Sequence, residues 1–296
     1  MNTLPKTYSQ ANLTNAIIEY KILTPEKLTK STTIVFLYGL VCNNRHWEFQ
    51  LDYFLQNGYR ILLHNYRYHF GSKAHVNDLK NNLTFSEISA DLEELLNHLN
   101  IQDVFFISHS MGVNISLELI KRNRHRVLGQ ILISGNPLDP KDTMFNTNKS
   151  HEVIPLLKTI LENNPNFFNP IWKNFYKIPV FRKIVLHGGF HPKMIKDEFV
   201  EYYLKKIGEL GPEVFFQLIE EMGNQSIISF LPKINTPTLI MGGDQDAIAP
   251  ISSQLIFKNL IKNSEFYLIK DGSHVPQADF PKTVNEKMVQ FIQLHH

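Results

Sequence analysis

The sequence predicts an α/β fold in which helices flank a mostly parallel central sheet that carries a helical insertion. Short apolar runs alternate with helical patterns along residues 1–136, and this alternation is typical of a parallel α/β sheet. The alternation is absent from residues 137–231 and returns over residues 232–296. One apolar run also turns into a helix within a few residues around Ser110. We therefore expect one core built from the first and third segments, with the middle segment as a helical cap.

The expected strands of the first core segment are short runs of apolar, mostly β-branched and aromatic residues. Ile17–Leu23 alternates apolar and polar residues, which indicates a half-exposed strand. Thr33–Tyr38 is a continuous apolar run, as expected of a strand buried on both faces of a parallel sheet. Further strands are expected at Ile61–His64, Val104–Ile107 and Gln130–Ile133.

Helices are expected between these strands. His46–Gln56 carries apolar residues at helical spacing, and Gly58 is placed to cap its C-terminus. Thr84 and Glu87 fit a capping box, and the apolar face of the helix that follows extends to Leu99.

The cap and the last core segment are read in the same way. The cap contains amphipathic pieces typical of helices, which are Ile154–Leu161, Lys196–Leu210 and Glu213–Met222. In the last segment, strands are expected at Pro237–Met241 and Glu265–Ile269, and helices are expected to begin at Pro250 and Pro281.

Composition limits the class of protein. The chain has 296 residues, of which 43% are hydrophobic and 20% charged, which is ample for one large core. Its net charge of +2 is too near neutral to imply nucleic acid or an anionic membrane as partner. The single cysteine, Cys42, allows no internal disulfide, and no apolar run approaches a membrane span. We predict a cytoplasmic protein that acts on a small molecule without stable insertion in a membrane.

The stretch around Ser110 carries the chemistry. The apolar run Val104–Ile107 ends in Ser-His-Ser-Met-Gly, and a second apolar segment, Val113–Ile120, follows at once. So sharp a turn from strand to helix strains its apex and requires small residues two positions to either side, here Ser108 and Gly112. Ser110 at the apex is therefore the predicted nucleophile.

A serine hydroxyl needs a base, and the base needs a partner that fixes its tautomer. Catalytic groups of parallel sheets gather at the carboxyl ends of the strands, so the loops that leave the strands are the place to look. His274 follows the last core strand and is the predicted base. Asp244 and Asp246 both follow the preceding strand, and we favour Asp246 because the turn at Gly243 is complete before it. Asp139, after the strand that precedes the cap, is a weaker alternative.

Acyl transfer also requires donors for the oxyanion that develops on the carbonyl oxygen. The backbone N–H of Met111, directly after the predicted nucleophile and at a helix start, is one candidate. The N–H of Leu40, in the loop after an earlier strand, is the second.

These motifs together resemble the α/β-hydrolase superfamily of capped serine hydrolases, from about Ile17 to Ile292. The resemblance rests on Tyr38-Gly39-Leu40 with Trp47, on Asn65-Tyr66-Arg67 through Gly71-Ser72, on Ser108 to Gly112, on Pro237 through Pro250, and on Gly272-Ser273-His274 through Pro281. The chain departs from the family at some positions, since the family usually has His at Tyr38, Asp at Asn65, and Gly at Tyr68, Phe70, Ser108 and Val113. The departures fall on loops near the site and bear on substrate class and efficiency rather than on fold.

Other residues near these motifs are weaker candidates for a role in the site. Tyr38 and His109 are candidates for lining the pocket, although Tyr38 more plausibly supports its loop and His109 more often would pack against neighbouring loops. Cys42 reads as a small buried apolar residue. No cluster of His, Cys, Asp and Glu has the spacing of metal ligands, and no glycine-rich phosphate loop occurs, so no cofactor is expected.

The sequence thus predicts a serine hydrolase that cleaves a carboxylic ester or a related acyl compound through an acyl-enzyme. A thioesterase, a lactonase, an amidase or a hydrolase of carbon–carbon bonds would use the same triad and stays open. A non-catalytic ligand-binding protein on this fold is the alternative from another class. An apolar acyl substrate is expected because the predicted cap is rich in aromatic residues, which are Phe167, Phe168, Trp172, Phe175, Tyr176 and Phe181.

Overall fold

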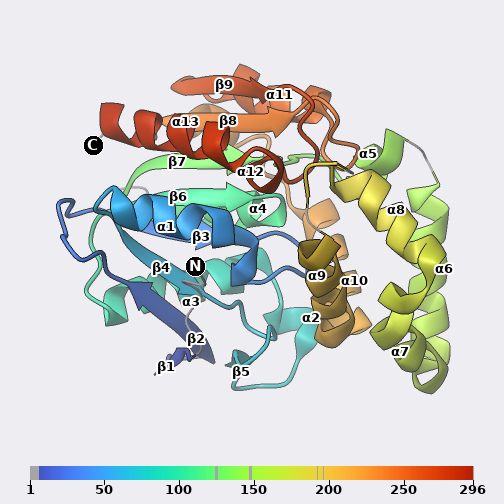
Figure 1. The fold of residues 1–296 in the computed structure, drawn as a ribbon. Helices are drawn as coiled ribbons and strands as arrows, with labels where there is room; N and C mark the ends of the chain where they lie inside the picture. Colours follow the sequence, from blue (N-terminus) through green and yellow to red (C-terminus); the bar gives the residue numbers. More distant parts are fainter. Residues whose placement is uncertain (1–6, 124–125, 147–148, 192, 196, 296) are drawn as a thin grey trace.

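A twisted, mostly parallel sheet runs through the molecule in this computed structural model, which describes residues 7–123, 126–146, 149–191, 193–195 and 197–295 (Figure 1). The described strands are β1 (Ser9–Asn12), β2 (Ala16–Leu23), β3 (Thr33–Leu37), β4 (Arg60–His64), β5 (Lys73–Ala74), β6 (Val104–His109), β7 (Val127–Ile133), β8 (Thr238–Gly243) and β9 (Ser264–Ile269). They are ordered β1-β2-β4-β3-β6-β7-β8-β9, and β5 pairs with β2. Strands β4, β3, β6, β7, β8 and β9 are parallel, and only the pairings of β2 are antiparallel.

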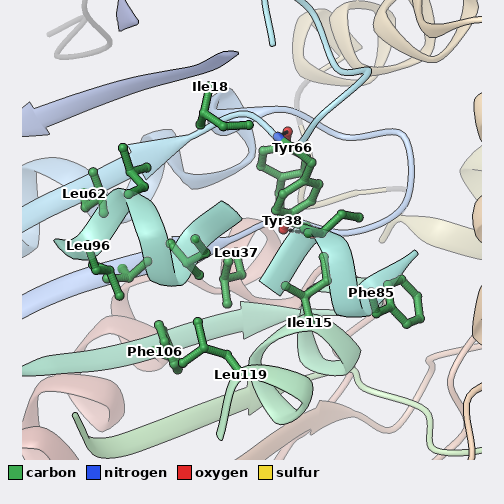
Figure 2. Close-up of a cluster of buried hydrophobic side chains, with 14 of the residues drawn as sticks. Ile18, Leu37, Tyr38, Leu62, Tyr66, Phe85, Leu96, Phe106, Ile115 and Leu119 are labelled. Atoms are coloured by element: carbon green, nitrogen blue, oxygen red, sulfur yellow. Dashed lines mark hydrogen bonds between the residues drawn. The ribbon is translucent and has the colours of Figure 1, made fainter. Parts of the chain in front are cut away.

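Helices cover both faces of the sheet. Alternate residues of each buried strand point to opposite faces, so Ile34 of β3 packs in one core cluster and Val35 in another. Helices α1 (Glu48–Gln56) and α13 (Pro281–Leu294) cover the first face, together with the 3-10 helix η1 (Asn44–Trp47) that precedes α1. Helices α3 (Phe85–His98), α4 (Met111–Asn123) and α11 (Ile251–Leu260) cover the second. Figure 2 shows Leu37 and Phe106 of the sheet packed against Ile115 and Leu119 of α4.

The chain between β7 and β8 is helical in its described part. Its helices are α5 (Pro140–Thr143), α6 (Ser150–Asn163), α7 (Pro165–Asn174), α8 (Pro179–Gly189), α9 (Asp197–Leu210) and α10 (Pro212–Asn224). Figure 1 places them beyond the ends toward which β6 and β7 point, with α9 and α10 nearer the sheet and α6 and α7 at the margin. None of the helices that the structure describes is long and apolar enough to cross a membrane.

Several elements were not expected from the sequence. Strand β1 is polar and short, and β5 spans two residues, so neither has an apolar pattern. Helix α2 (Leu79–Asn82) and helix α12 (Pro276–Asp279) are single turns that begin at a cap or a proline. Helices α7 and α8 are interrupted or opened by prolines, which sequence reasoning reads as breaks.

Candidate active site

Ser110 lies on the bend between β6 and α4 in a strained backbone conformation, with φ of +52°. Its N–H donates to the carbonyl of Ile133 on β7 at 2.9 Å, which anchors the bend to the sheet. Two residues on, a Cβ at Gly112 would lie 2.4 Å from the carbonyl oxygen of Leu37, so only glycine lets α4 pack this closely on β3. Ser108, two residues before, is fully buried in β6. The bend therefore holds Ser110 at the carboxyl end of the sheet, as the sequence predicts.

His274 and Asp246 lie beside Ser110 and form a continuous chain of hydrogen bonds with it. The Nε2 atom of His274 is 3.0 Å from Oγ of Ser110, and its Nδ1 atom is 3.0 Å from each carboxylate oxygen of Asp246. A backbone N–H of Ile248 and one of Ala249 donate to Oδ1 of Asp246 at 2.9 and 2.8 Å. The Asp246 side chain is fully buried, so these bonds fix its orientation. This is the geometry in which a carboxylate orients an imidazole toward a hydroxyl.

The other two candidate acids are engaged elsewhere. Asp244 accepts a hydrogen bond from the side chain of Gln245, at the surface. Asp139 caps α5 by accepting from the N–H of Lys141, and its carboxylate also pairs with the Lys141 ammonium at 3.2 Å. The structure thus brings Asp246, and neither Asp244 nor Asp139, to His274.

The two backbone N–H groups predicted to bind an oxyanion belong to Leu40 and Met111. Gly39 lies against the nucleophile, because a Cβ there would be 3.0 Å from Cβ of Ser110. Within the described part of the chain, no hydrogen bond uses the N–H of Leu40 or of Met111. The carbonyl of Gly39 accepts instead from the N–H of Cys42 at 3.2 Å, which tightens this loop. The N–H of Leu40, in the loop after β3, and the N–H of Met111, the first residue of α4, are therefore both unused in the described part of the chain.

His109 is buried behind the site rather than exposed in a pocket. Its Nε2–H donates to the backbone carbonyl of His274 at 2.8 Å, because a carbonyl can only accept. Its ring also packs on those of His46, with centroids 4.3 Å apart, and of His274, at 4.9 Å. Burial lowers the pKa of His109 well below its ordinary value and that of His46 to about 3, so both rings are neutral. The sequence marked His46 only as the start of a helix, since a histidine contact between distant loops leaves no local pattern.

Tyr38 is likewise fully buried. Its hydroxyl accepts from the N–H of Tyr66 at 3.0 Å and donates to Oδ1 of Asn65 at 3.5 Å. The Tyr66 hydroxyl donates back to the carbonyl of Tyr38 at 2.8 Å, and the two rings pack 4.3 Å apart (Figure 2). Burial raises the pKa of Tyr38 well above its ordinary value. This reciprocal pair joins the end of β3 to the loop after β4, so the buried Tyr38 side chain supports that loop.

The backbone keeps glycine-like conformations at two positions where the resembled family usually has glycine. Tyr68 has φ of +61° and Phe70 has φ of +52°. Residues other than glycine rarely adopt such positive φ values, so this loop holds Tyr68 and Phe70 in a strained backbone conformation.

The loop that carries His274 is held by a carboxylate that sequence reasoning missed. Asp279, on α12, accepts from both the N–H and the hydroxyl of Ser273, at 2.9 and 2.6 Å. Burial raises the pKa of Asp279. The Ser273 hydroxyl is also 3.2 Å from the carbonyl of Gly189 at the end of α8, so the loop touches the helical segment between β7 and β8. Among the residues that the structure describes, no group of three or more His, Cys, Asp and Glu could hold a metal ion.

The family model for the alpha/beta hydrolase fold matches residues 32–281. The chain belongs to this family. It is 24% identical over 249 residues to a non-heme chloroperoxidase of Kitasatospora aureofaciens, which covers 81% of this chain and 84% of that one. It is 22% identical over 267 residues to a bifunctional esterase/perhydrolase of Acinetobacter calcoaceticus, covering 88% and 91%.

A solved structure shows the same fold. The bromoperoxidase of Bacillus anthracis superposes with a TM-score of 0.76 at 20% identity, and the match covers 97% of this chain and all of that one (100%). The α/β-hydrolase fold predicted from the sequence is therefore confirmed.

Proposed function

We propose that this α/β hydrolase is a serine hydrolase that cleaves a carboxylic ester through an acyl-enzyme. The observation that carries the proposal is the unbroken chain of hydrogen bonds from Ser110 through His274 to Asp246, each link at 3.0 Å. Family membership and the esterase activity named for the Acinetobacter relative support it. An activated serine is the reactive group common to all the acyl-transfer alternatives.

In the proposed first half-reaction, Oγ of Ser110 attacks the ester carbonyl and its proton passes to Nε2 of His274. Asp246 stabilises the imidazolium that forms, and the N–H groups of Leu40 and Met111 bind the oxyanion. His274 then gives its proton to the departing alcohol, which leaves the acyl group on Ser110. In the second half-reaction, water attacks this ester, His274 again relays the proton, and the acid departs with Ser110 restored.

We further propose that residues 137–231 act as a cap over this site. Tyr203 of α9 supports this, because its hydroxyl is 3.1 Å from Sγ of Cys42, two residues beyond Leu40. The aromatic residues of the proposed cap support an apolar substrate less strongly than the sequence suggested. Phe168 and Trp172 pack on one another and on other cap residues, and Phe167 is exposed. Phe181 has a side chain outside those described.

A second activity, perhydrolysis, is favoured by the names of the relatives, which include haloperoxidases and an esterase/perhydrolase. In this reaction hydrogen peroxide replaces water as the attacking species on the acyl-enzyme, so a peracid is released and Ser110 is restored. It uses the same residues and would compete with hydrolysis when peroxide is present.

The test is steady-state hydrolysis of 4-nitrophenyl esters of increasing acyl length, with and without hydrogen peroxide. We expect Ser110→Ala to lower kcat by at least about 10⁴-fold, as removal of a triad nucleophile does elsewhere. Ser116→Ala is the matched control, since Ser116 is buried on α4 and donates only to the carbonyl of Val113. Equal turnover by Ser110→Ala and wild type would contradict the proposal, and peracid formation lost in Ser110→Ala would add the second activity.

A further inference from the structure

Helix α6 exposes an apolar face that nothing in the described chain covers. Val153, Leu156 and Leu157 follow one another at the spacing of one helical face, and all three are exposed, Leu156 by 59%. Ile154, Ile160 and Leu161 of the same helix pack in a cluster with Phe168 and Phe216, so only part of its wide apolar stripe is covered. Because an amphipathic helix normally buries its apolar stripe, the exposed stripe indicates an interaction surface.

Further exposed apolar residues lie on the next two helices. Phe167 and Ile171 lie one turn apart on α7, with Phe167 exposed by 66%. Ile178 and Val180 are exposed at the start of α8. Figure 1 places α6 and α7 at the margin of the molecule, away from the sheet. Nine of the sixteen exposed large apolar residues of the described chain lie in the segment from Phe145 to Met194, both ends included.

Charge is segregated within the cap in the same way. Seven basic residues stand against two acidic ones in residues 149–193, namely Lys149, Lys158, Lys173, Lys177, Arg182, Lys183 and Lys193 against Glu152 and Glu162. The ratio is reversed in residues 197–221, where Asp197, Glu198, Glu201, Glu209, Glu213, Glu220 and Glu221 stand against Lys205 and Lys206. The exposed apolar residues thus lie on the basic part of a cap whose remainder is acidic.

We propose that the outer surface of α6, α7 and the start of α8 docks on an anionic lipid surface. Exposed apolar side chains interleaved with Lys and Arg are what a helix needs to lie in the interface of such a membrane, with no segment crossing it. The excess of basic residues in the same segment fits the headgroups of anionic lipids. The docking surface lies on the proposed cap, so docking would hold that segment against the lipid.

The experiment is flotation of the whole protein with vesicles, carried out on the Ser110→Ala variant so that the result is independent of the proposed hydrolysis. Vesicles of phosphatidylcholine alone are compared with vesicles that also contain phosphatidylglycerol. We expect binding to the anionic vesicles that 0.5 M NaCl weakens. We expect Leu156→Glu to weaken it by at least fivefold, the effect of about one surface charge.

Leu294→Glu is the matched control, because Leu294 is also a helical leucine, exposed by 69%, but lies at the end of α13. A second variant, Lys173→Gln with Lys177→Gln, should weaken binding about twenty-five-fold if both lysines face the lipid. No flotation, or equal loss in Leu156→Glu and Leu294→Glu, would overturn the proposal. A dimer detected by light scattering and broken by Leu156→Glu would also overturn it, in favour of a second copy as the occupant.

Discussion

Buried neutral histidines should make this protein sensitive to mild acid. His64 at the end of β4 is 2% exposed, and neither of its ring nitrogens has a partner among the described residues. Burial lowers its pKa from an ordinary value of 6.5 to about 3. His46 has the same pKa of about 3 and His69 one of about 4, for the same reason. Each ring is neutral in the folded protein over a range where the unfolded chain binds a proton.

The size of the effect follows from linkage. Between pH 6.5 and pH 3 the unfolded state holds more protons than the folded state, so the free energy of unfolding falls as the pH falls. Each pKa unit corresponds to about 1.4 kcal/mol, so His64 alone costs about 2 kcal/mol at pH 5 relative to neutral pH. With His46 and His69 the loss reaches about 6 kcal/mol, which is a large part of the total stability of an ordinary domain.

Urea unfolding of wild type and His64→Leu at pH 7.5 and pH 5.0 measures this. We expect His64→Leu to lose about 2 kcal/mol less than wild type between the two pH values. At pH 7.5 the variant should be no less stable, because leucine removes an unsatisfied polar ring. His98→Leu is the control, since His98 is exposed on α3. If His64→Leu and wild type lose the same free energy of unfolding between pH 7.5 and pH 5.0, His64 is not a source of the acid sensitivity and the prediction is refuted.

Three further predictions concern the site and its supports. Asp246→Asn should lower kcat/KM for ester hydrolysis by about 10³- to 10⁴-fold, whereas Asp244→Asn should leave it within about twofold. Gly112→Ala should lower the free energy of unfolding by more than about 3 kcal/mol in urea titrations, because its Cβ would meet backbone rather than a movable side chain. Arg67→Ala should lower the free energy of unfolding by about 3–5 kcal/mol, because the buried carboxylate of Asp91, bonded to Arg67 at 2.6 and 2.7 Å, is left without its cation. The double variant Arg67→Met with Asp91→Leu should recover most of that loss.

The elements that could be predicted from the sequence are those that depend on a local pattern of residues. Continuous apolar runs predicted β6, which comes before Ser110 in the chain, and β7, which comes after it. The small residues Ser108 and Gly112 predicted the sharp bend at Ser110. Thr84 was expected to cap a helix, and its hydroxyl does accept from the N–H of Glu87 at 3.2 Å. Glu87 does not complete the box, however, because its carboxylate pairs with Arg67 at 3.0 Å. Long-range partners of this kind are decided by packing and leave no trace in spacing.

The parts that could not be predicted depend on contacts between distant segments. His46, His109 and His274 meet although they lie far apart in the chain, and Asp279 holds the His274 loop from a one-turn helix. The total charge of +2 hides the uneven distribution of charge in residues 137–231, where a basic stretch is followed by an acidic one. The positions of the charges on the surface, and not their sum, indicate which partners a protein can bind.

The proposed activated serine is tested most directly by mass-spectrometric mapping of a fluorophosphonate probe on the intact protein. We expect one adduct, on the peptide that contains Ser110, which is absent from Ser110→Ala and strongly reduced in His274→Ala. Asp246→Asn should slow the labelling while Asp244→Asn should not. Labelling at another residue, or none under conditions where a control serine hydrolase reacts fully, would contradict a nucleophile activated by His274 and Asp246.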